Sequence, residues 1–298
     1  MAILVDKNTK VLIQGITGYA GEQVCEMLQN YDTQVIAGVR PGKGGEKVRG
    51  VSVYNTVTEA LKTHSEVNTS LIYVPPGFVL DAALEAIEAK IPLIHIFTEK
   101  VPILDSAKIY SKAKEVGVRV IGPAAIGVIS PGLGKIGSVG GLENRGLTRG
   151  NIGVISKSGG MSSEIANTLS RAGLGQSTVV GIGGDIIACS NYVDILKLFK
   201  DDKETKAVVL FGEVGGTYEE EAAEYLKSFG FDKPVVAYIG GKFVGFLPQG
   251  TALGHAGAMI EQGRGTWESK VNSLKSAKVK VAETIEDLPK LLKESLNG

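Results

Sequence analysis

Cysteine is scarce in this chain. The two cysteines, Cys25 and Cys189, lie far apart and belong to no CxxC pair or His/Cys cluster. A disulfide framework and a structural zinc site are therefore not expected, and we expect no metal site in this chain. A reducing compartment fits this cysteine usage, and the cytoplasm is the predicted location.

The chain also lacks a charge excess and a long apolar run. It has 32 Lys and Arg against 32 Asp and Glu, without a basic stripe interleaved with aromatics, so nucleic acid is not an expected partner. The first apolar run stops at Asp6 and Lys7, and no later run approaches the roughly 20 residues of a membrane span. We therefore predict neither a signal peptide nor a membrane segment.

The first part of the chain, residues 1–125, alternates short β-branched runs with amphipathic stretches. This pattern predicts an α/β fold with a doubly wound parallel sheet, and hence a Rossmann-like domain. The expected strands are 10–14, 34–39, 70–74, 92–97 and 119–121, and the expected helices are 21–30, 80–89 and 106–116.

Two glycine-rich turns in this part indicate a nucleotide-like ligand. Gly15, Gly18 and Gly21 have a GxxGxxG spacing, which differs from the GxGxxG dinucleotide fingerprint. The second expected strand leads into Arg40-Pro-Gly-Lys43-Gly-Gly, where an NAD site would offer an acidic residue. This basic loop favours a ligand with an extra ribose phosphate, either NADP or the 3′-phospho-ADP end of coenzyme A.

Later strands of the same domain end in two further candidate segments. Tyr73-Val-Pro75 and Phe97-Thr-Glu99 follow expected strands, and ligands of such sheets bind beyond the carboxyl ends of the strands. Both segments are expected to line one crevice. His95, inside a strand, is predicted to be a packed histidine instead of a catalytic one.

A glycine-rich stretch without sustained periodicity, residues 126–150, is interpreted as a linker. Residues 151–298 then repeat the α/β alternation, which predicts a second parallel sheet of flavodoxin-like size. Its expected strands are 152–155, 177–182, 207–211, 235–239 and 278–281, and its expected helices are 161–171, 192–199, 266–276 and 285–296.

The candidate chemistry of the second domain centres on His255, one of three histidines. Gly254 and Gly257 flank it where a loop is expected to meet a helix, and a helix N-terminus favours anions. Glu213, after an apolar strand, can fix the tautomer of the imidazole and leave the other nitrogen free to attack phosphorus. The alternative interpretation is an ordinary cap histidine and a structural acid.

Seven motifs in one order give the chain a family resemblance. They are PGKGG from Pro41, TE at Thr98, GP at Gly122, SKSGG from Ser156, GIGGD from Gly181, GEVGG from Gly212 and GHAGA from Gly254. Together they resemble the α subunit of succinyl-CoA synthetase. The resemblance implies a coenzyme A-binding N-terminal domain and a phosphohistidine-bearing ligase domain. It also implies a separate β subunit whose ATP-grasp domain binds ATP or GTP with Mg²⁺, in an αβ or α₂β₂ assembly.

The resemblance also implies roles for individual residues. His255 is the phosphorylated nucleophile and Glu213 orients it. The implied phosphate-binding residues are Ser158, Gly159 and Gly160, to which the expected helix start adds Gly254, Ala256 and Gly257. The implied coenzyme A-binding residues are Thr17, Gly18, Tyr19, Ala20, Lys43, Phe97, Thr98 and Glu99, to which the strand-end argument adds Tyr73 and Pro75.

The departures from the succinate pattern lie at the substrate end, at Ala124, Ala125, Gly160, Met161 and Ser163. In these places the sequence is similar to citryl-CoA synthetase and to the ligase part of ATP-citrate lyase. Smaller side chains suit a bulkier acid, so citrate is favoured slightly over succinate. More remote alternatives are an NADP-dependent oxidoreductase and a non-catalytic CoA-binding protein.

Overall fold

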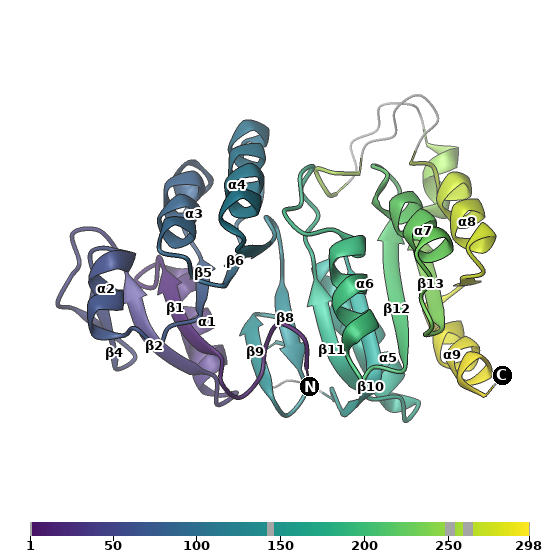
Figure 1. Ribbon diagram of the computed structural model, residues 1–298, viewed down its shortest axis with the longest axis horizontal. Coiled ribbons are helices and arrows are strands. Elements are labelled where there is room, and N and C mark those ends of the chain that lie inside the picture. Colours follow the sequence, from purple (N-terminus) through teal and green to yellow (C-terminus); the bar gives the residue numbers. More distant parts are fainter. Residues whose placement is uncertain (1, 142–145, 248–253, 259–264, 298) are drawn as a thin grey trace.

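The computed structural model describes residues 2–141, 146–247, 254–258 and 265–297. Two seven-stranded sheets lie side by side, each with helices packed on it (Figure 1). The strands β8 (Gly127–Ser130) and β9 (Gly134–Gly137) lie between the bulk of the two sheets in this view. The predicted α/β class is confirmed. Within the described ranges, no helix combines the length and apolar character needed to span a bilayer.

The first sheet has the strand order β3-β4-β2-β1-β5-β6-β7. Apart from the antiparallel β3, this is the doubly wound order of dinucleotide-binding folds, with its switch point between β1 and β5. The elements are β1 (Lys10–Gln14), α1 (Tyr19–Gln29), β2 (Gln34–Val39), β3 (Lys47–Val48), β4 (Val51–Tyr54), α2 (Val57–Thr63), β5 (Thr69–Ile72), the 3₁₀ turn η1 (Pro76–Phe78), α3 (Val79–Glu88), β6 (Leu93–Ile96), α4 (Ile103–Val116) and β7 (Arg119–Ile121).

The second sheet has the order β14-β13-β12-β10-β11-β8-β9. Its five parallel strands follow the flavodoxin-like order, with the switch point between β10 and β12. The elements are β10 (Arg149–Ser156), α5 (Gly159–Arg171), β11 (Gln176–Gly181), α6 (Tyr192–Asp201), β12 (Ala207–Glu213), α7 (Tyr218–Ser228), β13 (Val235–Gly240), η2 (Lys242–Phe246), α8 (Trp267–Ser276), β14 (Lys280–Ala282), η3 (Ile285–Asp287) and α9 (Leu288–Leu296).

Burial explains why β1 and β10 take central places. Val11, Leu12 and Ile13 are fully buried, and so are Ile152, Val154 and Ile155, although successive side chains of a strand point to opposite faces. Strands buried on both faces belong in the middle of a parallel sheet, where helices cover each side. The glycine-rich turns after these strands therefore open at the switch points.

The stretch interpreted as a linker requires a correction. Residues 127–137 form β8 and β9, and β8 pairs antiparallel with β11, so the second sheet begins well before residue 151. Gly127 and Gly137 lie opposite each other, and a Cβ on either would come within 2.2 Å of a carbonyl oxygen across the hairpin. These close-packed glycines removed the side-chain alternation by which strands are recognised.

Several further elements differ from expectation. The short β3, β4 and α2 were not predicted, and neither was α7, whose acidic first turn of Glu219, Glu220 and Glu221 hides its apolar face. The helix expected over 285–296 divides into η3 and α9, with a proline in the first turn of α9. Proline has no N–H to continue the ladder of a preceding helix, so a new helix begins there.

Candidate active site

The imidazole of His255 contacts the carboxylate of Glu213. Nδ1 lies 2.7 Å from Oε1 and 2.8 Å from Oε2, and Glu213 is the last residue of β12, beside the switch point of the second sheet. An ionised carboxylate only accepts hydrogen bonds, so the proton of the neutral ring is on Nδ1. The structure thus brings together the two residues for which catalytic roles were predicted, although they are 42 positions apart in sequence.

The second ring nitrogen is available for chemistry. Across the described part of the chain, no hydrogen bond reaches Nε2 of His255, whose side chain is 34% exposed. The hydrogen bond to Glu213 raises the pKa of His255, and partial burial lowers it to a smaller extent. A neutral ring held through Nδ1–H presents a lone pair at Nε2, which is the form a nitrogen nucleophile requires.

The segment 254–258 is docked on the loop that follows β11. The N–H of Gly257 donates to the carbonyl of Gly184 at 3.0 Å, and a Cβ on Gly184 would lie 2.9 Å from two carbons of the His255 ring. The absence of a side chain at Gly184 therefore lets the ring lie close to the backbone. The five residues form turns, with Ala256 exposed, and the helix predicted to follow falls on residues 259–264, outside the described ones.

The N-terminus of α5 lies beside His255, at a cavity that both Ser158 and His255 line. Ser158 is the N-cap and accepts from the N–H of Met161, while the first helical bond runs from the N–H of Ser162 to the carbonyl of Ser158. The N–H groups of Gly159 and Gly160 precede that ladder, as in anion sites at helix N-termini. A cavity of about 320 Å³ includes Ser158, Met161, Glu213, Gly254, His255 and Ala258 in its lining.

Lys157, within the same SKSGG motif, points elsewhere. Its side chain is 4% exposed, and its Nζ lies 3.5 Å from both the carboxylate of Glu219 and the carbonyl of Gly215. The ammonium also lies over the ring of Tyr218. The lysine therefore pairs beneath the Glu213 loop, although its charge is near enough to lower the pKa of His255 slightly.

The residues predicted for coenzyme A lie around the switch point of the first sheet. The turn 15–18 follows β1 and leads into α1, and a Cβ on Gly21 in that helix would lie 2.2 Å from the carbonyl oxygen of Gly15, so the backbone folds tightly there. Gly18 is the N-cap of α1 and supplies no side-chain cap, which leaves first-turn N–H groups for an anion. Thr17 and Ala20 are half-buried around it, and Tyr19 is 80% exposed.

The basic loop after β2 is organised by a residue that the sequence interpretation missed. Asn55 accepts from the N–H groups of Gly42 and Gly44 at 3.0 and 3.1 Å, which shapes the turn that carries Lys43. Lys43 is exposed and pairs with Glu46 at 2.7 Å. A surface pair of this kind contributes little, so a phosphate can displace it. Arg49, by contrast, pairs with Glu22 and Glu26 on α1.

The ends of β5 and β6 lie together, as expected, but their residues differ in exposure. Tyr73 is only 9% exposed, and its ring stacks on Phe97 with centroids 4.7 Å apart. Its side chain therefore supports Phe97 more than it offers a surface. Thr98 donates to the carbonyl of Val74 at 2.6 Å, while Pro75 and Glu99 are exposed.

The substrate-end residues lie where the two sheets meet. Ala124 donates its N–H to Thr98 and Ala125 donates to Ile96, and His95, fully buried, bonds through Nε2 to the carbonyl of Ala125 at 2.8 Å. Met161 lines the His255 cavity and Gly160 has open space around it. Ser163 is directed elsewhere, because its hydroxyl accepts from the N–H of Gly140 at 3.2 Å.

Asp185 links the loop after β11 to the segment after β6. Its carboxylate accepts from the N–H groups of Lys100 and Val101, both at 3.2 Å. Burial raises the pKa of Asp185, while the charges of Glu99 and His255 act on it in opposite directions. The carboxylate of Asp185 is therefore within electrostatic range of Glu99, at the strand end predicted for coenzyme A, and of the His255 imidazole.

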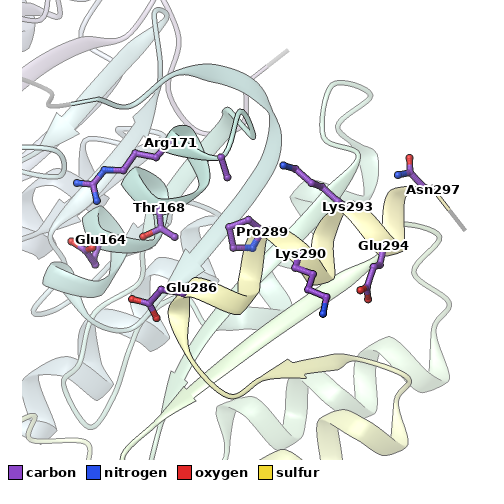
Figure 2. Close-up of a pocket in the computed structure, with 10 residues that line it drawn as sticks. Glu164, Thr168, Arg171, Glu286, Pro289, Lys290, Lys293, Glu294 and Asn297 are labelled. Atoms are coloured by element: carbon purple, nitrogen blue, oxygen red, sulfur yellow. The ribbon is translucent and has the colours of Figure 1, made fainter.

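A larger pocket lies elsewhere on the second domain. It is about 720 Å³ and is formed by α5 and the η3–α9 segment, with Glu164, Thr168, Arg171, Glu286, Pro289 and Lys290 among its lining residues (Figure 2). It contains none of the residues predicted for catalysis, phosphate or coenzyme A. The smaller cavity at His255 carries the convergent chemistry.

Four residues were missed as functional candidates, namely Lys157, Glu219, Lys270 and Asn55. Glu219 and Lys270 are almost fully buried, and each sits in a polar helical stretch whose sequence reads as a solvated face. Only the close pairing of segments about 50 positions apart reveals them. Among the described residues, no group of three or more His, Cys, Asp and Glu side chains has an arrangement suited to a metal ion.

Two protein families match successive parts of the chain. A CoA binding domain matches residues 6–100, which contain the glycine turn at α1 and the Lys43 loop. A CoA-ligase domain matches residues 155–280, which contain the α5 N-terminus, Glu213 and His255. Each match therefore contains the switch point of one of the two sheets.

Full-length relatives identify the combination. The chain is 48% identical to succinate–CoA ligase [ADP-forming] subunit alpha 1 of Archaeoglobus fulgidus, over 99% of both chains. It is 44% identical to the corresponding Staphylococcus aureus subunit alpha, over 99% of this chain and 95% of that one. ATP citrate lyase from Methanothrix soehngenii, solved with citrate and coenzyme A, superposes with a TM-score of 0.91 at 27% identity, over 99% of this chain but half of its own length. The chain therefore belongs to the family of succinate–CoA ligase α subunits, CoA ligases that use coenzyme A as a substrate.

Proposed function

We propose that this chain is the α subunit of an acid–CoA ligase that works through a phosphohistidine at His255. The observation that carries the proposal is the hydrogen bond of Nδ1 to Glu213, while no described residue bonds to Nε2, in a cavity that Ser158 of the α5 N-terminus also lines. Nε2 attacks the γ-phosphorus of ATP or GTP, the P–N bond forms, and the nucleoside diphosphate leaves. The ring gains positive charge, which the Glu213 carboxylate stabilises.

The chain's own residues hold the phosphoryl group between its two transfers. We assign this role to the N–H groups of Gly159 and Gly160 and the hydroxyl of Ser158, together with the backbone around Gly254, Ala256 and Gly257. Of these residues, Ser158 and Gly254 line the same cavity as His255. Mg²⁺ accompanies the nucleotide to offset its charge and is held mainly by the partner chain.

The second half of the reaction transfers the phosphoryl group to the acid. A carboxylate oxygen of the acid attacks phosphorus, the P–N bond breaks and an acyl phosphate forms. The thiolate of coenzyme A then attacks the acyl carbon, and inorganic phosphate leaves as the thioester forms. The turn 17–20, Lys43, Pro75 and the segment 97–99 bind coenzyme A, supported by the uncapped helix start at Gly18.

The relatives named as alpha subunits imply a partner chain. We propose a β subunit with an ATP-grasp domain, which supplies the nucleotide site in an αβ or α₂β₂ assembly. A cytoplasmic location is proposed as well, because both cysteines are free thiols.

Two acids are candidates for the substrate. Citrate is favoured by the open space at Gly160 beside the cavity and by the likeness to an ATP citrate lyase solved with citrate. Succinate is favoured by the names of the relatives with 44–48% identity. Ser163 supports neither acid strongly, since its hydroxyl is bonded to the Gly140 backbone.

The experiment is thioester formation by the chain reconstituted with its β partner, ATP, Mg²⁺ and coenzyme A. Citrate and succinate are supplied at matched concentrations, and kcat/KM is compared. Preference for citrate supports the substrate-end residues as specificity determinants. Preference for succinate rejects that role and leaves the ligase chemistry. No thioester with any di- or tricarboxylate, when His255 is also not phosphorylated, rejects the proposed function.

A further inference from the structure

A cluster of buried charges lies beneath the Glu213–His255 pair. Its members are Lys157, Glu219 and Lys270, which are 4%, 1% and 0% exposed. They come from the turn before α5, the first turn of α7 and the first turn of α8. This buried lysine–glutamate cluster therefore ties three segments together at the switch point of the second sheet.

Glu219 holds the end of β12. Its Oε1 accepts from the backbone N–H of Glu213 at 3.2 Å. The hydroxyl of Tyr192 lies 3.4 Å from the same oxygen and donates its proton to the carbonyl of Phe211 at 2.5 Å. A Cβ on Gly212 would lie 2.6 Å from Cγ of Glu219, so only glycine there allows the approach. The backbone from which the Glu213 side chain extends is thus fixed by one buried carboxylate.

The two lysines hold the loop on the other side of Glu213. Nζ of Lys157 lies 3.5 Å from the carbonyl of Gly215, and Nζ of Lys270 donates to the carbonyl of Gly216 at 3.0 Å. Both ammonium groups also pair with Glu219. The loop that begins with Glu213 is therefore anchored at both ends by one set of charges.

From these contacts we infer that Glu219 is a positioning residue for the phosphohistidine reaction, since it aims the Glu213 carboxylate at Nδ1 of His255. The inference rests on the proposed role of His255. A buried ion pair is a poor way to gain stability, because desolvation offsets much of the attraction. In this chain the charges are arranged around the backbone of Glu213, which a packed apolar cluster could not bond.

Glu220 provides a matched control. It neighbours Glu219, its carboxylate lies 3.0 Å from the same Lys270, and its side chain is 19% exposed. Its other bond comes from the hydroxyl of Ser269. Glu220→Gln therefore removes a charge from the same lysine without removing a bond to the Glu213 strand.

The test compares Glu219→Gln with Glu220→Gln in the full chain, each alone and with Glu213→Gln. NMR titration of the His255 ring gives its proton affinity. Glu219→Gln is expected to weaken that affinity at least about threefold, and Glu220→Gln to leave it within about twofold. On the Glu213→Gln background, Glu219→Gln is expected to have no further effect, because Glu219 acts through Glu213.

Phosphorylation of the αβ complex by labelled ATP gives the second readout. Glu219→Gln is expected to slow it about tenfold relative to Glu220→Gln. Equal effects of Glu219→Gln and Glu220→Gln would overturn the inference. So would an effect of Glu219→Gln that is as large on the Glu213→Gln background as in the wild type. If Glu219→Gln does not fold, Glu219→Asp, which keeps the charge but shortens the reach, must show the same pattern. Loss of phosphorylation in the wild type itself would reject the proposed function and leave the NMR result to judge Glu219.

Discussion

His95 is expected to make the protein acid-sensitive. The side chain is fully buried in β6, its Nε2 bonds to the carbonyl of Ala125, and its Nδ1 has no hydrogen-bond partner among the residues that the structure describes. Burial lowers the pKa of His95 to about 4 from an ordinary value of 6.5. Protonation would place a charge inside the core beside the Ala124–Ala125 segment.

The magnitude and sign follow from linkage. As the pH falls below 6.5, the unfolded chain takes up a proton at this histidine, and the folded chain does so only near pH 4. The contribution of neutral His95 to the unfolding free energy is therefore fully present above pH 6.5 and is lost progressively as the pH falls to 4. A shift of one pKa unit corresponds to 1.36 kcal/mol, so the loss over this window is about 3 kcal/mol.

The assay is urea unfolding of the wild type and His95→Gln at a series of pH values from 7 to 4. Glutamine can keep an N–H donor for the Ala125 carbonyl and does not titrate. The wild type is expected to lose about 3 kcal/mol more than the variant on acidification. Parallel pH dependences of the two proteins would refute the reasoning, because the histidine would then not be the group that titrates.

Three further predictions concern the pair at the switch point and the hairpin. Gly184→Ala places a Cβ 2.9 Å from the His255 ring and should slow phosphorylation about tenfold in a labelling time course. The control Gly77→Ala, where a Cβ would meet open space, should change the rate less than about twofold. Glu213→Gln removes the main cause of the raised His255 pKa. In a pH–rate profile, the midpoint of the rise in phosphorylation rate should therefore lie at a lower pH than in the wild type, and the plateau should be lower. Gly127→Ala combines a φ of 125° with a Cβ 2.1 Å from a carbonyl oxygen, and should lower the unfolding free energy by about 3 kcal/mol or more in a denaturant titration. A rate, profile or stability equal to the wild type would contradict the respective contact.

Strong local patterns allowed most of the regular fold to be predicted. The expected strands over 10–14, 34–39 and 119–121 match β1, β2 and β7 in both bounds. These strands are apolar runs with turn residues on each side, so local composition sufficed. The hairpin of β8 and β9 was lost because its glycines pack backbone against backbone and leave no alternation to read.

The candidate site divides in the same way. His255 and Glu213 stand in glycine-flanked motifs that the sequence displays. Glu213 ends β12, but His255 lies well beyond the end of β13, and its contact with Glu213 is made by the segment 254–258 docked on the loop after β11. Ser163 was taken for a residue that widens the substrate end, yet its hydroxyl is bonded to Gly140. Glu219 and Lys270 carry no local signal, because their burial depends on α7 packing against α8 and on α8 packing against β13. Contacts of that kind are a property of tertiary structure.

The most direct measurement is the site of phosphorylation after the chain is mixed with its β partner and γ-labelled ATP in Mg²⁺. The account predicts acid-labile label on Nε2 of His255, found by mass spectrometry of the intact histidine peptide. It predicts that His255→Asn takes up no label. It also predicts that the label leaves the wild-type protein when the carboxylic acid substrate and coenzyme A are added together. Label that persists in His255→Asn, or that resides on another residue, would contradict the account.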